Sequence, residues 1–294
     1  MNPVIMHVNY GEVRWDSFGK NTIDDIFKMA ADIGFDGIEL RGNPPKEFKD
    51  MPFMDYMDLV VKAQKKYGVK TILFGIQVEN TICADKDERA AGVHKALEKA
   101  KVVNDLCGTT ICNTFAQFIS SPIPTAPKGA VEFNGSAAAT EEQWKLTVDS
   151  FQQVGKGLEP LGVKFAFETH MNYIHDLPAS TKKLVDMIDS PNIGINMDYG
   201  NTVYFPVRPT LEEAIDLYGD KLFYIHLKNS MPIASGGRMA TALSEGEINH
   251  RLYLKKLREV GFDGPIGIEA PRPGDRLWFA QKDLEYYKAV AATI

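Results

Sequence analysis

Four short apolar runs in the second half of the sequence each end in a carboxylate or an imidazole. They read Lys164-Phe-Ala-Phe-Glu168, Ile193-Gly-Ile-Asn-Met-Asp198, Leu222-Phe-Tyr-Ile-His226 and Pro265-Ile-Gly-Ile-Glu269. Each run is rich in β-branched and aromatic residues, and polar, Gly or Pro residues follow it, which is typical of a buried parallel strand. The sequence therefore predicts four strands that each end in a residue able to bind a metal ion.

The spacing of these four residues predicts that they meet. Successive members are 28 to 43 residues apart, which leaves room for a loop, a crossover helix and the next strand. In an eight-stranded βα barrel the C-terminal ends of the strands converge on one mouth, so we expect Glu168, Asp198, His226 and Glu269 to share one centre. A single carboxylate at a strand end is more often a surface residue or a helix cap. Three converging carboxylates would raise one another's pKa, so a bound cation is the simplest compensation.

Composition indicates an ordinary globular protein with a small-molecule partner. The chain has 294 residues, of which 44% are hydrophobic and 24% are charged, and no linker or composition shift divides it. We expect one domain over residues 1–294. The net charge of −6 and the absence of a long Lys/Arg run argue against a nucleic-acid partner.

The cysteines and the N-terminal stretch favour a cytoplasmic location. Cys83, Cys107 and Cys112 are too few and too irregularly spaced for a disulfide framework or a thiolate metal site. Residues 1–10 lack the basic region and apolar stretch of a signal peptide, and no apolar run approaches membrane-spanning length. We therefore expect no membrane partner.

The remaining segments alternate between strand and helix patterns. Eight units of about 37 residues match a single (β/α)8 TIM barrel. The alternative, a doubly wound open sheet, would need a Gly-rich phosphate loop after the first strand, and residues 9–14 do not form one. The expected first four strands lie at about residues 4–8, 36–41, 70–76 and 109–115, and the expected helices at about 21–31, 54–67, 87–106, 141–158, 180–189, 210–218, 247–260 and 278–290.

Residues 116–139 fit neither pattern and form a long loop insertion after the fourth strand. The stretch Ser121-Pro-Ile-Pro-Thr-Ala-Pro-Lys-Gly129 is rich in turn residues. Excursions of this length in a compact domain are usually functional or disordered. We expect a lid or a wall of the substrate pocket, and an insertion that serves only subunit contact is the alternative.

Several phrases together resemble a known family. They are Gly34-Phe-Asp-Gly-Ile-Glu-Leu40, Phe165-Ala-Phe-Glu-Thr-His170, Met197-Asp-Tyr-Gly-Asn201, His226-Leu-Lys-Asn229 and Gly261-Phe-Asp-Gly-Pro-Ile-Gly-Ile-Glu269. With Glu, Asp, His and Glu at the ends of strands five to eight, the chain resembles the xylose-isomerase-like TIM barrel superfamily. In particular, it resembles the sugar phosphate isomerase/epimerase branch of that superfamily, which includes the ketohexose 3-epimerases.

That resemblance implies a metal centre and an acid–base pair. Glu168, Asp198, His226 and Glu269 match the family's ligands for one divalent metal ion. Three oxygen ligands and one imidazole suit Mn²⁺, Mg²⁺ or Co²⁺, and we expect Mn²⁺, with Zn²⁺ left open. Glu168 and Glu269 would exchange a proton with the carbon beside a carbonyl, while the metal stabilises the enediolate.

The sequence also departs from the epimerase pattern. Asn201 stands where those enzymes usually carry a His, and Ile174 stands where the ketohexose epimerases carry an acidic residue. Both changes argue against a ketohexose substrate. His170 lies two residues beyond Glu168 and would point to the same side if the strand continued, so it is a candidate catalytic acid or base.

Five further residues are candidates for substrate contact. Lys228 follows His226 by two positions and could bind a substrate oxygen, although a surface charge is equally compatible. Glu39 and Asn113 end strands two and four on the presumed mouth side, Asn201 follows strand six, and Arg272 follows Glu269 in a Pro-rich turn.

These observations favour a divalent-metal-dependent sugar isomerase or epimerase. The alternative is a metal-dependent lyase or dehydratase that acts on a keto-sugar or a 3-keto-glycoside after the same proton abstraction. An endonuclease-type phosphodiesterase would need a cluster of metals with many His ligands, which six scattered histidines and a negative net charge disfavour. A non-catalytic sugar-binding protein is the remaining alternative. The expected partner is a small carbohydrate, and a homo-oligomer is compatible with the sequence.

Overall fold

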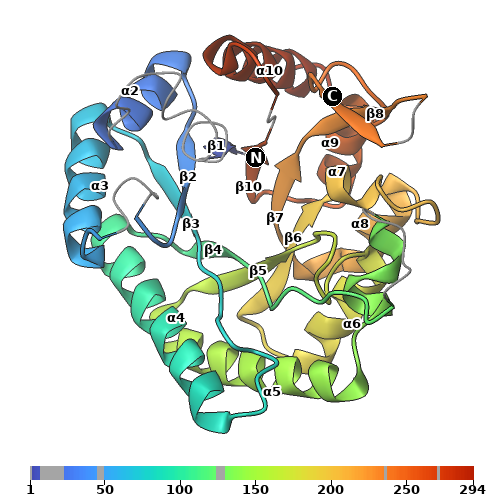
Figure 1. Cartoon of the computed structure of the whole chain (residues 1–294). Helices are drawn as coiled ribbons and strands as arrows, with labels where there is room; N and C mark the ends of the chain where they lie inside the picture. The colour runs from blue at the N-terminus through green and yellow to red at the C-terminus, as the bar shows by residue number, and fades with distance from the viewer. Residues whose placement is uncertain (1, 7–22, 45–49, 124–129, 235–236, 270–271) are drawn as a thin grey trace. The chain divides into compact units, whose positions relative to one another are not determined.

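The computed structural model describes residues 2–6, 23–44, 50–123, 130–234, 237–269 and 272–294 (Figure 1). Eight strands form a closed barrel in the order β1-β10-β7-β6-β5-β4-β3-β2. This order confirms the predicted (β/α)8 barrel. The barrel strands are β1 (Asn2–Met6), β2 (Gly37–Arg41), β3 (Thr71–Gly75), β4 (Ile111–Thr114), β5 (Lys164–Glu168), β6 (Ile193–Asp198), β7 (Leu222–Leu227) and β10 (Pro265–Ile268).

Helices connect the barrel strands at the predicted places. The helices are α2 (Ile23–Ile33), α3 (Phe53–Tyr67), α4 (Lys86–Cys107), α5 (Glu141–Leu158), α6 (Pro178–Ile188), α7 (Tyr199–Thr202), α8 (Leu211–Tyr218), α9 (His250–Glu259) and α10 (Arg276–Ala291), with 3-10 turns η3 (Val131–Phe133), η4 (Gly135–Ala137), η5 (Glu159–Leu161) and η6 (Gly219–Lys221). A capping box begins α5, in which Thr140 Oγ1 accepts from the Gln143 amide and Gln143 Oε1 accepts from the Thr140 amide. Within the described residues, no helix is both long and apolar enough to span a membrane.

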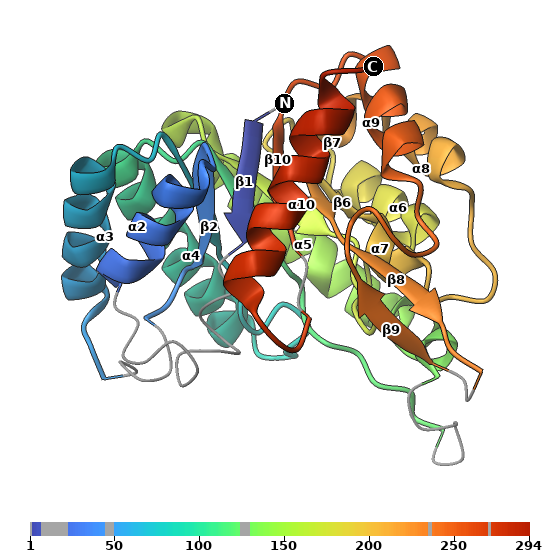
Figure 2. The same cartoon turned by 90° about the horizontal axis from the view of Figure 1, so that it is seen from above.

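Contacts divide the chain into two compact units, and the first comprises residues 1–75, 103–109 and 225–294. Its strands pair in parallel, β3 with β2, β2 with β1, β1 with β10, and β10 with β7. Ile38, Leu40, Ile266 and Ile268 on these strands are fully buried or nearly so. Helices α2 and α3 lie side by side outside β2, and α10 packs against α9 and β10 (Figure 2).

The second unit comprises residues 76–102 and 110–224. Here β4, β5 and β6 pair in parallel, with Asn113 opposite Ala166 and Glu168 opposite Asn196. Phe165 and Phe167 on β5 are fully buried, and the ring of Phe167 lies 4.4 Å from that of Phe151 on α5. This packing fixes β5 and with it the position of Glu168. The prediction of one domain over residues 1–294 stays a prediction.

Two elements near the strand ends were not predicted. A one-turn helix, α7, begins immediately after β6, and an antiparallel hairpin of β8 (Asn229–Pro232) and β9 (Arg238–Thr241) follows β7. The strands of this hairpin are short and lack an alternating apolar pattern, so they give no strand signal in the sequence.

The predicted insertion contains short elements in its described part. Phe118 bridges Tyr173 in antiparallel fashion, and η3 and η4 follow at residues 131–137. Gly135 has φ of +59°, and a Cβ there would lie 2.2 Å from Asp176 Oδ2, so the turn requires glycine. Residues 124–129, like the start of the predicted helix at 21–22 and the end of the predicted first strand at 7–8, lie outside the described residues. The role as a lid or wall stays a prediction.

Candidate metal centre

Two of the predicted ligands, Glu168 and Asp198, are buried carboxylates at the ends of β5 and β6. Glu168 is 4% exposed and Asp198 is fully buried. Asp198 caps α7, because its Oδ1 accepts from the backbone amide of Asn201 at 3.1 Å. The single turn of α7 therefore places the Asn201 side chain next to the C-terminal end of β6.

The amide of Asn201 links the two carboxylates. Its Nδ2 lies 2.8 Å from Asp198 Oδ2, 3.2 Å from Glu168 Oε1 and 3.0 Å from the carbonyl oxygen of Thr169. An amide nitrogen carries two hydrogens, so one hydrogen is shared between acceptors. Asn201 therefore holds Glu168 and Asp198 in a fixed relation. Its predicted contact with substrate stays a prediction.

Two further amide side chains form a line of hydrogen bonds to Oε2, the other carboxylate oxygen of Glu168. Asn113 on β4 donates from Nδ2 to Glu168 Oε2 at 2.9 Å, and Asn196 on β6 donates from Nδ2 to Asn113 Oδ1 at 3.1 Å. All three residues are at least 96% buried. Both oxygens of Glu168 thus accept amide hydrogens, which favours its ionised form and fixes its orientation. Sequence reasoning proposed Asn113 as a substrate contact and missed Asn196, although Asn196 sits two residues before Asp198 and so on the same face of β6.

The other two predicted ligands, His226 and Glu269, lie on β7 and just after β10. His226 is fully buried, and the side chain of Glu269 is 12% exposed. The register of β10 and β7 brings His226 and Glu269 close together, because Ile268 pairs with Leu227 and the Glu269 amide donates to the Leu227 carbonyl at 2.8 Å. His226 Nδ1 lies 3.9 Å from Glu269 Oε2, while Lys228 Nζ donates to the same oxygen at 3.0 Å.

Glu39 adds a further buried carboxylate next to His226. It lies on β2, is 4% exposed, and places Oε2 at 2.9 Å from His226 Nε2. The flanking residues Ile38 and Leu40 are buried on the opposite face of the strand, so Glu39 points to the barrel interior. Glu39 was predicted to contact substrate, and this prediction stays untested beside its observed contact with His226.

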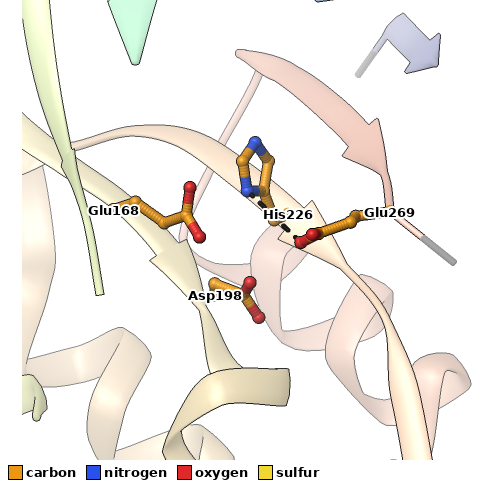
Figure 3. A group of neighbouring side chains, drawn as sticks. All are labelled: Glu168, Asp198, His226 and Glu269. Carbon is orange, nitrogen blue, oxygen red and sulfur yellow. Dashed lines mark ion pairs between the residues drawn. The ribbon is translucent and has the colours of Figure 1, made fainter. Parts of the chain in front are cut away.

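The four predicted ligands form one buried cluster that could bind a metal ion. Each of Glu168, Asp198, His226 and Glu269 offers one ligand atom, and these atoms all lie within 4.8 Å of one another. Figure 3 shows the side chains pointing toward one another from their strand ends. Hard carboxylate oxygens with one imidazole suit a divalent ion such as Mn²⁺ or Mg²⁺. The identity of the ion stays a prediction.

His170 lies beyond the end of β5, in a group of aromatic rings. Its ring is edge-on to Phe115 at 5.8 Å and to Tyr173 at 5.5 Å, and its Nδ1 lies 2.9 Å from the carbonyl oxygen of Met171. A hydrogen on Nδ1 would leave Nε2 as the proton-accepting atom. The strand does not continue to residue 170, so the position of His170 depends on the loop and not on strand alternation.

His175 is a buried residue of this region for which no sequence pattern indicates a role. Its Nδ1 donates to the carbonyl oxygen of Glu168 at 2.6 Å, and its Nε2 accepts from the Ala116 amide at 3.1 Å. Burial lowers the pKa of the ring to about 4, so it is neutral at pH 7. His175 therefore joins the end of β5 to the segment after β4.

Arg272 lies in a different environment from the other substrate candidates. Its Nη2 donates to Asp283 Oδ2 at 2.6 Å, and its guanidinium stacks on the ring of Phe279 at 4.5 Å. Both charged groups are buried, and Asp283 also accepts from the Leu243 amide at 3.0 Å. These contacts describe a buried ion pair with α10, and a role in substrate binding stays a prediction.

Known proteins resemble this chain over nearly its whole length. Inosose dehydratase from Clostridium beijerinckii is 23% identical over 290 residues, which cover 92% of this chain and 90% of that protein. The 2-oxo-tetronate isomerase from Haemophilus influenzae is 23% identical and covers 87% of this chain and 92% of that protein. The solved structure of D-allulose 3-epimerase from Methylomonas sp. in complex with D-allulose has a TM-score of 0.73 and 16% identity, and covers 98% of this chain and 96% of that one.

These relatives are a dehydratase, an isomerase and an epimerase, which supports an enzyme of the same superfamily. The family model described as xylose isomerase-like TIM barrel matches residues 27–290. The chain therefore belongs to the xylose isomerase-like TIM barrel family.

Proposed function

We propose that this protein is a divalent-metal-dependent sugar isomerase or epimerase that removes a proton from the carbon beside a carbonyl. The observation that carries the proposal is the convergence of ligand atoms from Glu168, Asp198, His226 and Glu269 within 4.8 Å. Membership of the family and the names of its relatives support a small carbohydrate substrate.

The donor set fits a divalent ion. Three carboxylates that converge in a buried site repel one another, and a cation relieves this repulsion. Glu168, Asp198, His226 and Glu269 would hold the ion, and we favour Mn²⁺ for its preference for oxygen donors with imidazole. When bound, the ion would supply a positive charge that polarises the substrate carbonyl.

Glu168 and Glu269 are the proposed proton acceptor and proton donor. Amide donors from Asn113 and Asn201 hold both oxygens of Glu168, whereas the ammonium group of Lys228 contacts Glu269. Two carboxylates of this kind let one group remove a proton and the other return it. Lys228 keeps 16% of its side chain exposed, so it can also donate to a substrate oxygen that gains negative charge.

A specific observation favours elimination as the second candidate. His170 is partly buried among aromatic rings, with Nδ1 next to a backbone carbonyl and Nε2 as its second proton site. Nε2 can accept a proton, and the resulting imidazolium can give that proton to a departing hydroxyl or glycosyl oxygen. Asn201 occupies the position at which the epimerases usually carry a histidine, so His170 would supply the acid–base imidazole in such a lyase or dehydratase.

Metal content and solvent-deuterium exchange test the proposal together. Wild type, His226→Ala and Glu269→Gln would be measured for bound metal, and each would then be incubated in D2O with a panel of ketoses and keto-glycosides. We expect one divalent ion per chain in wild type, loss of that ion in His226→Ala, and deuterium incorporation by wild type alone. Deuterium in recovered sugar supports the isomerase or epimerase, and release of water or an aglycone supports the lyase. Bound metal without exchange into any compound would contradict the proposed chemistry.

A further inference from the structure

The contact between Glu39 and His226 determines how the imidazole faces the proposed metal. Glu39 Oε2 lies 2.9 Å from His226 Nε2, and both side chains are buried. An ionised carboxylate only accepts hydrogen bonds, so the hydrogen of this bond belongs to Nε2. In a neutral imidazole the other nitrogen, Nδ1, then carries a lone pair.

The position of Nδ1 matches that of a metal ligand. Nδ1 lies 3.9 Å from Glu269 Oε2, which is too long for a hydrogen bond. Two ligand atoms that each lie about 2.1 Å from one ion are separated by no more than about 4.2 Å. A distance of 3.9 Å therefore leaves Nδ1 and the Glu269 oxygen able to bind the same ion.

We infer that Glu39 is a positioning residue that fixes His226 as the Nε2–H tautomer and presents Nδ1 to the cation. This inference rests on the proposed metal site and adds a residue that is not among the four ligands. It gives Glu39 a role through His226 instead of through the substrate. Such partners orient the ring and raise the basicity of its ligand nitrogen.

The fold places Glu39 for this role by strand register. Glu39 is the third residue of β2, opposite Met6 of β1 and Leu73 of β3. Its neighbours Ile38 and Leu40 anchor the strand in the core, so the carboxylate cannot turn away from the interior without moving the strand. The phrase Gly34-Phe-Asp-Gly-Ile-Glu-Leu40 thus contributes a side chain to the metal centre from the first quarter of the sequence.

Two substitutions separate the hydrogen bond from the charge. In Glu39→Gln the side-chain carbonyl can still accept from Nε2, whereas Glu39→Leu removes the acceptor. We expect Mn²⁺ or Mg²⁺ affinity, measured by calorimetry, to fall by a few-fold in Glu39→Gln and by about 10- to 100-fold in Glu39→Leu. Tyr56→Phe is a matched control, because it removes a partly buried hydrogen bond to the Arg41 carbonyl in the same unit and should bind metal like wild type.

Ring ¹⁵N NMR of histidine-labelled protein reads the tautomer directly. The His226 signals are assigned by their absence in His226→Ala, and spectra are recorded without metal above pH 8 and again with Mg²⁺. We expect the proton on Nε2 in wild type and in Glu39→Gln, and a mixture of tautomers in Glu39→Leu. A proton on Nδ1 in wild type, or wild-type metal affinity in a folded Glu39→Leu, would overturn the inference. If wild type bound no metal, the proposed function would fail, while the metal-free spectra would still decide whether Glu39 sets the tautomer.

Discussion

Removal of the Asn201 amide should destabilise the metal-free protein, because one nitrogen serves two buried carboxylates. In Asn201→Ala, Asp198 Oδ2 and Glu168 Oε1 lose donors at 2.8 and 3.2 Å. Each carboxylate keeps another donor, since Asp198 Oδ1 accepts from the Asn201 backbone and Glu168 Oε2 accepts from Asn113. The loss is therefore partial at each carboxylate.

The magnitude follows from the number of charged acceptors. A hydrogen bond to a charged group contributes about 1.5 to 3 kcal/mol, and two such bonds that share one amide should be worth about 2 to 4 kcal/mol together. In a chain of this size that loss lowers the melting temperature by about 3 to 7 °C. A bound metal ion would itself offset the negative charge of the two carboxylates. The difference in stability between Asn201→Ala and wild type should therefore shrink in saturating Mn²⁺.

Urea unfolding with and without Mn²⁺ measures both effects. Asn192→Ala is the matched control, because the Asn192 amide donates at 2.9 Å to a neutral carbonyl, that of Val163, in the same unit. Its loss should cost about 1 kcal/mol and should not depend on metal. If Asn201→Ala lost no more stability than Asn192→Ala in metal-free buffer, the reasoning from shared carboxylate donors would be refuted.

Two further predictions concern buried charges in the first unit. Burial lowers the pKa of His250 to about 4, below the value of 6.5 for the unfolded ring, so the unfolded state binds the proton more tightly. Stability should therefore fall by about 3 kcal/mol as the pH drops from 6.5 to 4, and a His250→Gln variant with the same pH slope in urea titrations would contradict this. Arg272→Met should cost about 3 kcal/mol or more, because it leaves the Asp283 carboxylate buried without its cation. In thermal melts, the double variant Arg272→Met with Asp283→Asn should regain most of that stability. An Arg272→Met variant as stable as wild type would argue against a structural role for the ion pair.

The fold and the four clustered residues could be predicted from sequence for a common reason. A buried strand in a parallel barrel is apolar along its length, and side chains able to bind a metal or transfer a proton occur at its C-terminal end. The residue that ends each run, such as Asp198 after Ile193-Gly-Ile-Asn-Met, therefore gives both the strand boundary and the candidate ligand. The strand bounds at β5 and β6 agree with the predicted ones to the residue.

The contacts around these residues could not be predicted, because they depend on tertiary register. Glu39 meets His226 through the pairing of β2, β1, β10 and β7, and no sequence pattern relates two positions so far apart. His175 lies in a loop, and its burial depends on the Ala116 amide from another loop. The helix α7 has only four residues, too few for a periodic pattern. Its one sequence signal is Asp198, because aspartate is a common residue at the N-cap of a helix.

The pairing of β1 with β10 has a consequence for how the protein is made. Asn2 pairs with Pro265 and Ile5 with Ile268, so β1 joins a partner strand that is translated much later than β1 itself. Until then β1 presents an unpaired edge to the nascent chain and to other molecules. Contacts between residues so distant in sequence also slow folding, because a long loop must close before the pairing contributes stability. Translation pauses or early termination before residue 265 should therefore yield chains that aggregate and depend on chaperones.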